Sequence, residues 1–164
     1  MLDEMGPPAP HPCVSCPYPR DVASGVWDFA EYEKLRGYDG EMGEQPPGVF
    51  QCHQAGGDSP ARRMCAGWVG CHGGRELLAL RLALVRARIR PEAFEAAEVY
   101  VSPVGLFNSG AEAADHGQRE IEWPGAAAVW LIQKIGTVRS DLASSESGSG
   151  GTSLRAERQA SADS

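Results

Sequence analysis

The sequence predicts a mainly α fold, with a small α+β arrangement as its variant, in which helices and one or two short strands surround a Cys/His metal site. The helical class rests on an apolar stripe between Arg75 and Arg88, where leucines recur at helical spacing. The metal site rests on a group of soft ligands, because all five cysteines, together with His53 and His72, lie within residues 13–72. A chelating turn closed by later segments is how a small chain encloses a metal ion.

Composition divides the chain into a lead-in, one domain and a tail. Residues 1–11 are rich in proline and lack periodicity, so we expect a flexible lead-in. Residues 12–136 are expected to form a single metal-binding domain, with the cysteine cluster over 13–72 and a helical part over 75–136. The serine- and glycine-rich composition of residues 137–164 predicts a disordered low-complexity tail.

Local signals place the elements of the cysteine-rich half. An aspartate cap and a terminal glycine predict a short helix over residues 28–36. A loop rich in glycine and proline follows, and residues 48–52 then read as one short strand that carries a cysteine. A serine cap followed by proline predicts a helix over residues 59–68.

The second half is predicted to be helical throughout. The apolar stripe predicts a helix over residues 75–88 that ends before Pro91. We expect a short helix over residues 92–98 and another over 102–114, which Ser102 would start. A proline before it and a glycine at its end bracket a last helix over residues 126–135.

Charge is unevenly distributed along the chain. The formal net charge is −7, yet residues 13–90 hold ten basic and nine acidic residues, so the cysteine region is nearly neutral. This balance argues against nucleic-acid binding by bulk electrostatics and leaves local patches open. One such patch is a row of arginines on the predicted helix, which could touch phosphates but which we interpret as a solvated helix face: Arg75, Arg81, Arg86, Arg88 and Arg90.

The N-terminal residues carry no apolar core of a secretory signal, and no run of the sequence is long and apolar enough to span a bilayer. We therefore expect a cytoplasmic protein with reduced thiols and no membrane partner. In that compartment a CxxC pattern more often indicates metal or redox chemistry than a disulfide framework.

Spacing nominates one set of four thiolates as metal ligands. The pair at positions 13 and 16 can reach one ion without strain, and a tetrahedral zinc then needs two further ligands. The predicted ligands are Cys13, Cys16, Cys52 and Cys65, with His53, Cys71 and His72 as alternates. Because neighbouring strand residues point to opposite faces, we expect only one of Cys52 and His53 to bind.

The identity of the metal stays open at this point. Zinc accepts any mixture of cysteine and histidine and is our first choice. A [4Fe–4S] cluster also takes four cysteines from separated segments, often with a proline beside one of them, as Pro17 is beside Cys16. Thiol redox chemistry is a third reading, although the prolines around this CxxC fit poorly with a thioredoxin-like helix start.

Three sequence elements resemble those of an uncharacterised family of small cysteine-rich proteins from high-GC bacteria and their phages. The first is Pro12-Cys-Val-Ser-Cys-Pro-Tyr-Pro-Arg20 with Ser24-Gly-Val-Trp27, the second Val49-Phe-Gln-Cys-His53, and the third Cys65-Ala-Gly-Trp68. They lie within residues 12–72. The resemblance implies that the four nominated cysteines form one set with His53 as a companion, and it implies no activity.

The sequence therefore predicts a non-enzymatic metal-binding protein, a small regulatory or interaction module with a structural zinc site. Its partner would be a protein or a nucleic acid. The alternative is an iron–sulfur protein that senses redox state or transfers electrons. An enzyme with an open metal position would need an acid or base such as Asp58 or Glu76, and we find no Ser-His-Asp set, dinucleotide fingerprint or P-loop.

Overall fold

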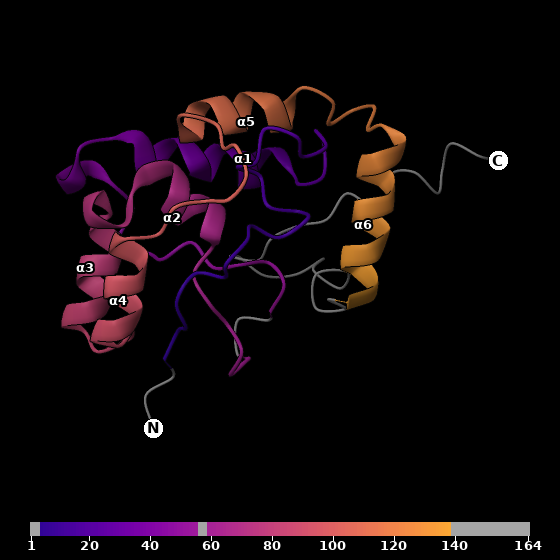
Figure 1. Cartoon of the computed structure of the whole chain (residues 1–164). Helices are drawn as coiled ribbons and strands as arrows, with labels where there is room; N and C mark the ends of the chain where they lie inside the picture. The colour runs from indigo at the N-terminus through magenta and orange to yellow at the C-terminus, as the bar shows by residue number, and fades with distance from the viewer. Residues whose placement is uncertain (1–3, 56–58, 139–164) are drawn as a thin grey trace.

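The protein is mainly helical, as the sequence predicts. The structure, a computed structural model, describes residues 4–55 and 59–138, in which six α-helices and three 3-10 helices supply the regular elements (Figure 1). The α-helices are α1 (Phe29–Arg36), α2 (Ala66–His72), α3 (Leu78–Val85), α4 (Pro91–Glu98), α5 (Gly110–Gln118) and α6 (Ala126–Val138). The 3-10 helices are η1 (Gly37–Asp39), η2 (Met42–Glu44) and η3 (Gly74–Glu76).

The predicted strand over residues 48–52 does not form. Within the described ranges, extended pairing is confined to isolated bridges, one of which joins Gln51 to Met64. Backbone bonds from Cys52 N to Arg63 O (2.9 Å) and from Cys65 N to Phe50 O (2.8 Å) flank that bridge. The segment is thus extended and paired over too short a length to count as a strand.

Helices α1 and α5 pack against each other and form one layer of the molecule (Figure 1). Two glycines of α5 permit the close approach. A Cβ at Gly110 would overlap the backbone carbonyl of Leu35, and a Cβ at Gly117 would overlap the ring of Tyr32. Both α1 side chains are buried. The absence of a side chain at these two positions of α5 therefore sets the separation of the two helices.

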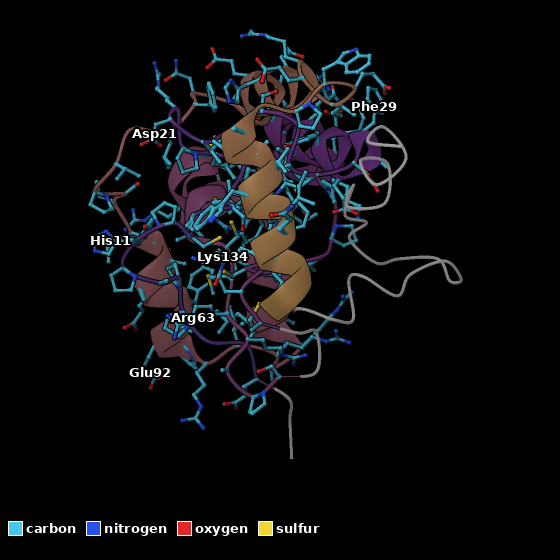
Figure 2. All side chains as sticks on the ribbon, turned by 90° about the vertical axis from the view of Figure 1, so that its right-hand side faces the viewer. His11, Asp21, Phe29, Arg63, Glu92 and Lys134 are labelled. Atoms are coloured by element: carbon cyan, nitrogen blue, oxygen red, sulfur yellow. The ribbon has the colours of Figure 1, made fainter. Side chains whose placement is uncertain are left out.

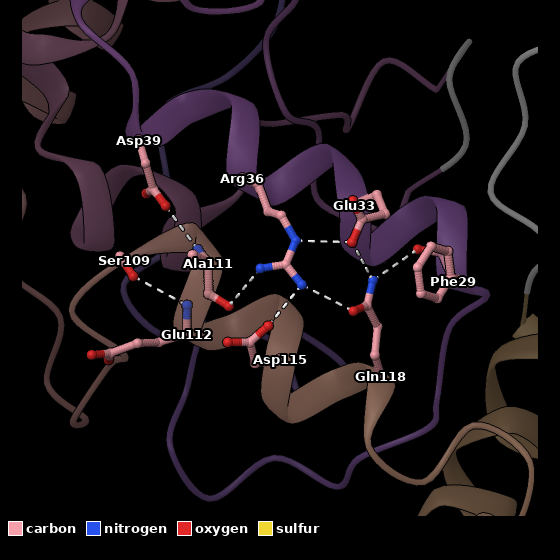
Figure 3. A network of polar contacts seen from close by, with 9 residues as sticks. All are labelled: Phe29, Glu33, Arg36, Asp39, Ser109, Ala111, Glu112, Asp115 and Gln118. Atoms are coloured by element: carbon pink, nitrogen blue, oxygen red, sulfur yellow. Dashed lines mark hydrogen bonds and ion pairs between the residues drawn. The ribbon is translucent and has the colours of Figure 1, made fainter.

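Arg36 joins the exposed edges of α1 and α5 (Figure 3). Its guanidinium donates to Glu33 at 2.8 Å on its own helix. Across the interface it donates to Asp115 at 2.7 Å and to the side-chain oxygen of Gln118 at 3.0 Å. Because solvent screens these exposed ion pairs, they stabilise the interface only weakly, and packing supplies the larger share.

The predicted helix over residues 75–88 is interrupted at its start and is shorter at its end. Leu77 is extended between η3 and α3, and the side chain of Gln45 bridges this break. Its amide donates to Glu76 O at 2.9 Å and accepts from Leu78 N at 3.0 Å. The helix ends at Val85 because Ala87 adopts a left-handed conformation with φ of 54°.

Two other predicted helices begin later than their local signals indicate. The helix predicted over residues 59–68 starts at Ala66, because the residues before it pair with the segment around Gln51. The helix predicted over residues 102–114 starts at Gly110 with Ser109 as its cap. There the preceding residues bond to the 18–20 segment, through Phe107 N to Tyr18 O (2.9 Å) and Arg20 N to Gly105 O (3.1 Å).

The helices predicted over residues 28–36, 92–98 and 126–135 are present as α1, α4 and α6. The described part of the predicted lead-in is attached to the fold, since Met5 N donates to Arg88 O and Gly6 N to Arg62 O, each at 3.0 Å. Most of the predicted tail lies outside the described residues.

Helix α6 lies across the cysteine-rich loops on one side of the molecule, as the view that faces it shows (Figure 2). Leu131, Lys134 and Ile135 of α6 line a small pocket together with Ser15 and His53. Several α6 side chains are buried, Ala128, Leu131, Ile132 and Ile135 among them. No helix in the described part of the chain is long and apolar enough to cross a membrane.

We predict that Gly110→Ala destabilises the protein by about 2 kcal/mol. A helical alanine gains at most ~1 kcal/mol over glycine, whereas the overlap with a backbone carbonyl that cannot rotate away costs more, as overpacking of cores does. The matched control is Gly43→Ala, because a Cβ at Gly43 meets nothing within 4 Å. Urea unfolding of both variants measures the difference, and equal stabilities would contradict the packing role of Gly110.

Candidate metal centre

The Cys13–Cys16 segment is a tight turn. Cys16 N donates to Cys13 O at 3.0 Å, which closes the turn and places both thiols on nearby positions. Cys16 is fully buried and Cys13 is half-buried. The backbone carbonyl of Ser15, between them, accepts a 2.9 Å hydrogen bond from the indole of Trp27. The turn is therefore fixed from inside the fold, as a chelating pair requires.

Cys65 meets this turn from the start of α2. It is the N-cap residue of that helix, and its Sγ accepts from Trp68 N at 3.5 Å. The Sγ atoms of Cys16 and Cys65 lie 3.6 Å apart. Gly67 makes this approach possible, because a Cβ at that position would overlap Cys16 Sγ. The spacing of Cys65, Gly67 and Trp68 thus has a structural reason in the thiol contact.

Cys52 completes the group beside Cys13. The pairing of residues 50–52 with residues 63–65 carries Cys52 next to the start of α2. Cys13 and Cys52 lie close enough for their thiols to influence each other, and Cys13 Sγ also lies 3.5 Å from Ser15 Oγ. The structure therefore places Cys16 in contact with Cys65 and carries Cys52 close to Cys13.

The four thiols influence one another electrostatically. The hydrogen bond from Cys52 lowers the pKa of Cys13 to about 6. The same bond and burial raise the pKa of Cys52. Burial first, then the contact with Cys65 and the charge of Cys13, raises the pKa of Cys16. At neutral pH the group thus holds a thiolate at Cys13 beside neutral thiols at Cys16 and Cys52, because additional negative charges would repel one another in a poorly solvated place.

The thiols are close but do not yet share one centre. Over residues 4–55 and 59–138, no three or more His, Cys, Asp and Glu side chains are arranged as a formed metal-binding group. The donor chemistry nevertheless fits a soft cation, since cysteine sulfurs from separate chain segments lie close together, with Cys16 and Cys65 in contact. Binding an ion would require the four Sγ atoms to turn toward a common point.

The predicted companion His53 lies against aromatic rings. Its imidazole packs on Trp27 with ring centroids 4.1 Å apart and meets Phe50 edge-on at 5.6 Å. Trp27 is almost completely buried. Trp68, the other tryptophan of the motifs, is fully buried, and its ring meets Tyr38 at 5.3 Å. Both tryptophans therefore supply apolar surface close to the cysteines.

The two remaining alternates lie at the other end of α2. Burial raises the pKa of Cys71 to about 12, with a further contribution from the charge of Asp39. His72 Nε2 lies 3.1 Å from Tyr18 Oη, and its Nδ1 lies 3.5 Å from Asp39 Oδ1. Asp39 also accepts from Gly110 N at 2.7 Å. His72 thus belongs to a chain of polar contacts that ties α2 to the start of α5.

Sequence reasoning missed Tyr18 and Asp39. Tyr18 is fully buried. The sequence feature that could have indicated its importance is its position between Pro17 and Pro19, two residues after Cys16. Asp39 lies in η1, within a segment that the sequence predicted as a loop because of its glycines and prolines. Of the two residues named for an open catalytic site, Glu76 is exposed in η3, and Asp58 lies outside the described residues.

The chain belongs to a family of unknown function, DUF6283, whose model matches residues 8–139. That range contains all five cysteines and every described helix. No curated protein and no solved structure matches the chain. The membership confirms the expected resemblance to an uncharacterised family, and the geometry above supplies the evidence for function.

We predict that His72 makes the protein sensitive to acid. Burial lowers the pKa of His72 to about 4, whereas an unfolded histidine titrates near ~6.5. The unfolded chain therefore binds a proton first, and the free energy of unfolding falls by about 3 kcal/mol from this residue as pH drops from ~6.5 to ~4.

Urea unfolding at several pH values checks this contribution. The wild type should lose about 3 kcal/mol more across that window than His72→Gln, because the variant has nothing to protonate there. His11→Gln is the matched control, since His11 is exposed. Identical slopes for the wild type and His72→Gln would show that His72 is not held neutral by the fold.

Proposed function

Because the family has no assigned function, we propose one from the site itself: Cys13, Cys16, Cys52 and Cys65 bind a single zinc ion that holds the N-terminal half together. The protein would act as a non-enzymatic cytoplasmic module that binds a protein or a nucleic acid. The observation that carries the proposal is the contact of the Cys16 and Cys65 thiols, beside which Cys13 and Cys52 lie close to each other.

The spacing of the thiols favours a single ion over a cluster. Two thiolates on one tetrahedral zinc, with Zn–S bonds of about 2.3 Å, lie roughly 3.8 Å apart. The Cys16 and Cys65 sulfurs are 3.6 Å apart, so this pair needs little adjustment. A four-iron cluster binds each thiolate to a different iron, and its ligands must therefore stand farther apart.

Electrostatics explains why a divalent cation would stabilise this group. Zinc binds thiolates, so protons must leave Cys16 and Cys52, whose pKa values are raised in the metal-free protein. The charge of the ion offsets the repulsion that keeps those thiols neutral. A small core gains stability from such a clip.

Four protein ligands would leave no open coordination position, which is the pattern of structural rather than catalytic zinc. The module would then work through its surface. Two apolar side chains beside the first ligand turn favour a protein partner, since Val14 is 48% exposed and Trp130 of α6 is 56% exposed. Both line the cavity next to Cys13.

The alternative is a [4Fe–4S] protein with a redox-sensing or electron-transfer role. Buried Pro17 directly after Cys16 favours it, because a proline beside a ligand is common at such clusters. The two readings differ in colour and in metal content, so a single purification separates them.

We expect one zinc per chain and a colourless protein after purification without oxygen. Elemental analysis and a visible absorption spectrum measure both quantities on the same sample. Four irons with sulfide and a broad band near ~400 nm would instead establish the iron–sulfur alternative. A protein that binds neither metal under these conditions would refute both readings.

We further expect Cys65→Ser to lose zinc and stability, because three ligands hold the ion less tightly and the contact with the Cys16 sulfur is lost. A structural ion present at about a thousandfold above its dissociation constant contributes roughly 4 kcal/mol. A strong chelator should therefore lower the melting temperature and the helical circular dichroism of the wild type.

Cys71→Ser is the matched control, since Cys71 lies outside the proposed ligand set. It should keep its zinc and lose at most about 1 kcal/mol. If the chelated wild type kept its helicity and melting temperature, zinc would have no structural role. If Cys71→Ser lost the metal as Cys65→Ser does, the assignment of ligands would be wrong.

A further inference from the structure

The contact between the Cys16 and Cys65 sulfurs joins residues 49 positions apart in the chain. Their Sγ atoms lie 3.6 Å apart, and the two residues are 0% and 2% exposed. Both are free thiols. A disulfide bond would bring the sulfurs to about 2.05 Å, so they need to approach by only roughly 1.5 Å from the contact seen here. Two buried thiols at this separation are a candidate disulfide pair.

The backbone holds both cysteines at the positions that the contact requires. Cys16 N donates to Cys13 O at 3.0 Å within the first turn, and Cys65 N donates to Phe50 O at 2.8 Å. Trp68 N donates to the Cys65 sulfur at 3.5 Å, which sets the direction of that side chain. The pair is therefore preorganised by interactions other than the thiol contact itself.

Gly67 keeps the two chain segments close together at this point. A Cβ at position 67 would overlap the Cys16 sulfur and crowd the side chain of Tyr18. Gly67 lies within α2 and does not adopt a left-handed conformation. Its backbone angles therefore suit any residue, and glycine is needed here for space alone. The glycine allows the sulfur of Cys16 to reach Cys65.

Burial of the pair restricts the oxidant to a small molecule. Cys13 and Val14, in the same turn as Cys16, line a cavity of about 400 Å³, and Cys13 is only half-buried. This cavity gives solvent access to the turn three residues before Cys16. Hydrogen peroxide is little larger than water and can follow solvent into such a place, whereas a bulky disulfide such as oxidised glutathione cannot.

We propose that a small peroxide oxidises Cys16 and Cys65 to a reversible disulfide, which makes the pair a redox-sensitive modification site. The thiolate of one cysteine attacks a peroxide oxygen, the O–O bond breaks, and the leaving hydroxide takes up the proton of that thiol to form water. The second thiol then attacks the resulting sulfenic acid, which forms the S–S bond and releases a second water. The peroxide is reduced by the two electrons that the thiols lose.

The disulfide and the proposed zinc ion would compete for the same sulfurs. Two of the four proposed ligands would be consumed by the bond, so oxidation should release the ion. This consequence rests on the proposed function, whereas the disulfide itself rests on the thiol contact. The covalent bond would keep the first turn attached to α2 after the ion has left, and it would close a long loop of the chain.

Peroxide treatment of the full-length protein, purified without oxygen, tests the proposal. The treated protein is unfolded and alkylated, and the number of alkylated cysteines should fall from five to three. Treatment with dithiothreitol before alkylation should restore all five. Tandem mass spectrometry of the tryptic digest should find residues 1–20 linked to residues 64–75, with fragment ions that place the bond between Cys16 and Cys65.

Cys71→Ser is the matched control, since it removes the other cysteine of the second peptide and should form the same bond. Cys16→Ser should not form it, and the map of the wild type stands even if that variant fails to fold. A bond from Cys13 to Cys16 or to Cys52 would overturn the proposal, as would five alkylated cysteines after peroxide treatment. Protein unfolded in urea should form the bond at least about tenfold more slowly, because it must first close the loop, and equal rates would also overturn the proposal.

Zinc content, measured on the same samples, separates this proposal from the proposed function. Release of zinc in step with formation of the disulfide would support both. A sample that holds no zinc and still forms the bond between Cys16 and Cys65 would refute the zinc site alone. A sample that holds zinc and forms no such bond under excess peroxide would refute the modification site alone.

Discussion

The contact between the Cys16 and Cys65 thiols over Gly67 is the constraint on which the rest of the molecule depends. It fixes the first turn of the chain to the start of α2. Two residues later Tyr18 reaches His72 at the end of the same helix, at 3.1 Å, and its carbonyl accepts from Phe107 N. One short segment therefore holds both ends of α2 and the loop that leads into α5.

The sequence correctly predicted the helices whose start and end signals lie in the adjacent residues. The segments that became α1, α4 and α6 carry their own stops, caps or prolines. Predictions were wrong where a distant segment competed for the backbone. Residues before Ala66 and before Gly110 bond to other parts of the chain. This tertiary pairing prevents the helices from starting at the caps predicted at positions 59 and 102. Sequence periodicity carries no information about such pairing.

The site shows the same division between local and distant information. Spacing nominated the four cysteines as one set, because a CxxC turn is a local unit, and the fold places Cys16 against Cys65. Their arrangement in pairs, and the separate role of His72 with Tyr18 and Asp39, depend on contacts that join residues more than thirty positions apart. The arginines were read as one helix face because nothing in the sequence indicates that alanine at position 87 adopts a left-handed conformation.

The cysteine group concentrates ionisable side chains within a small fold. The cysteine group gathers potential negative charge in a buried place and stays largely neutral because Cys16 and Cys52 keep their protons. A bound cation would relieve this constraint by displacing the protons. Acid should therefore weaken cation binding at the cysteines, because protons compete with the ion for the thiolates.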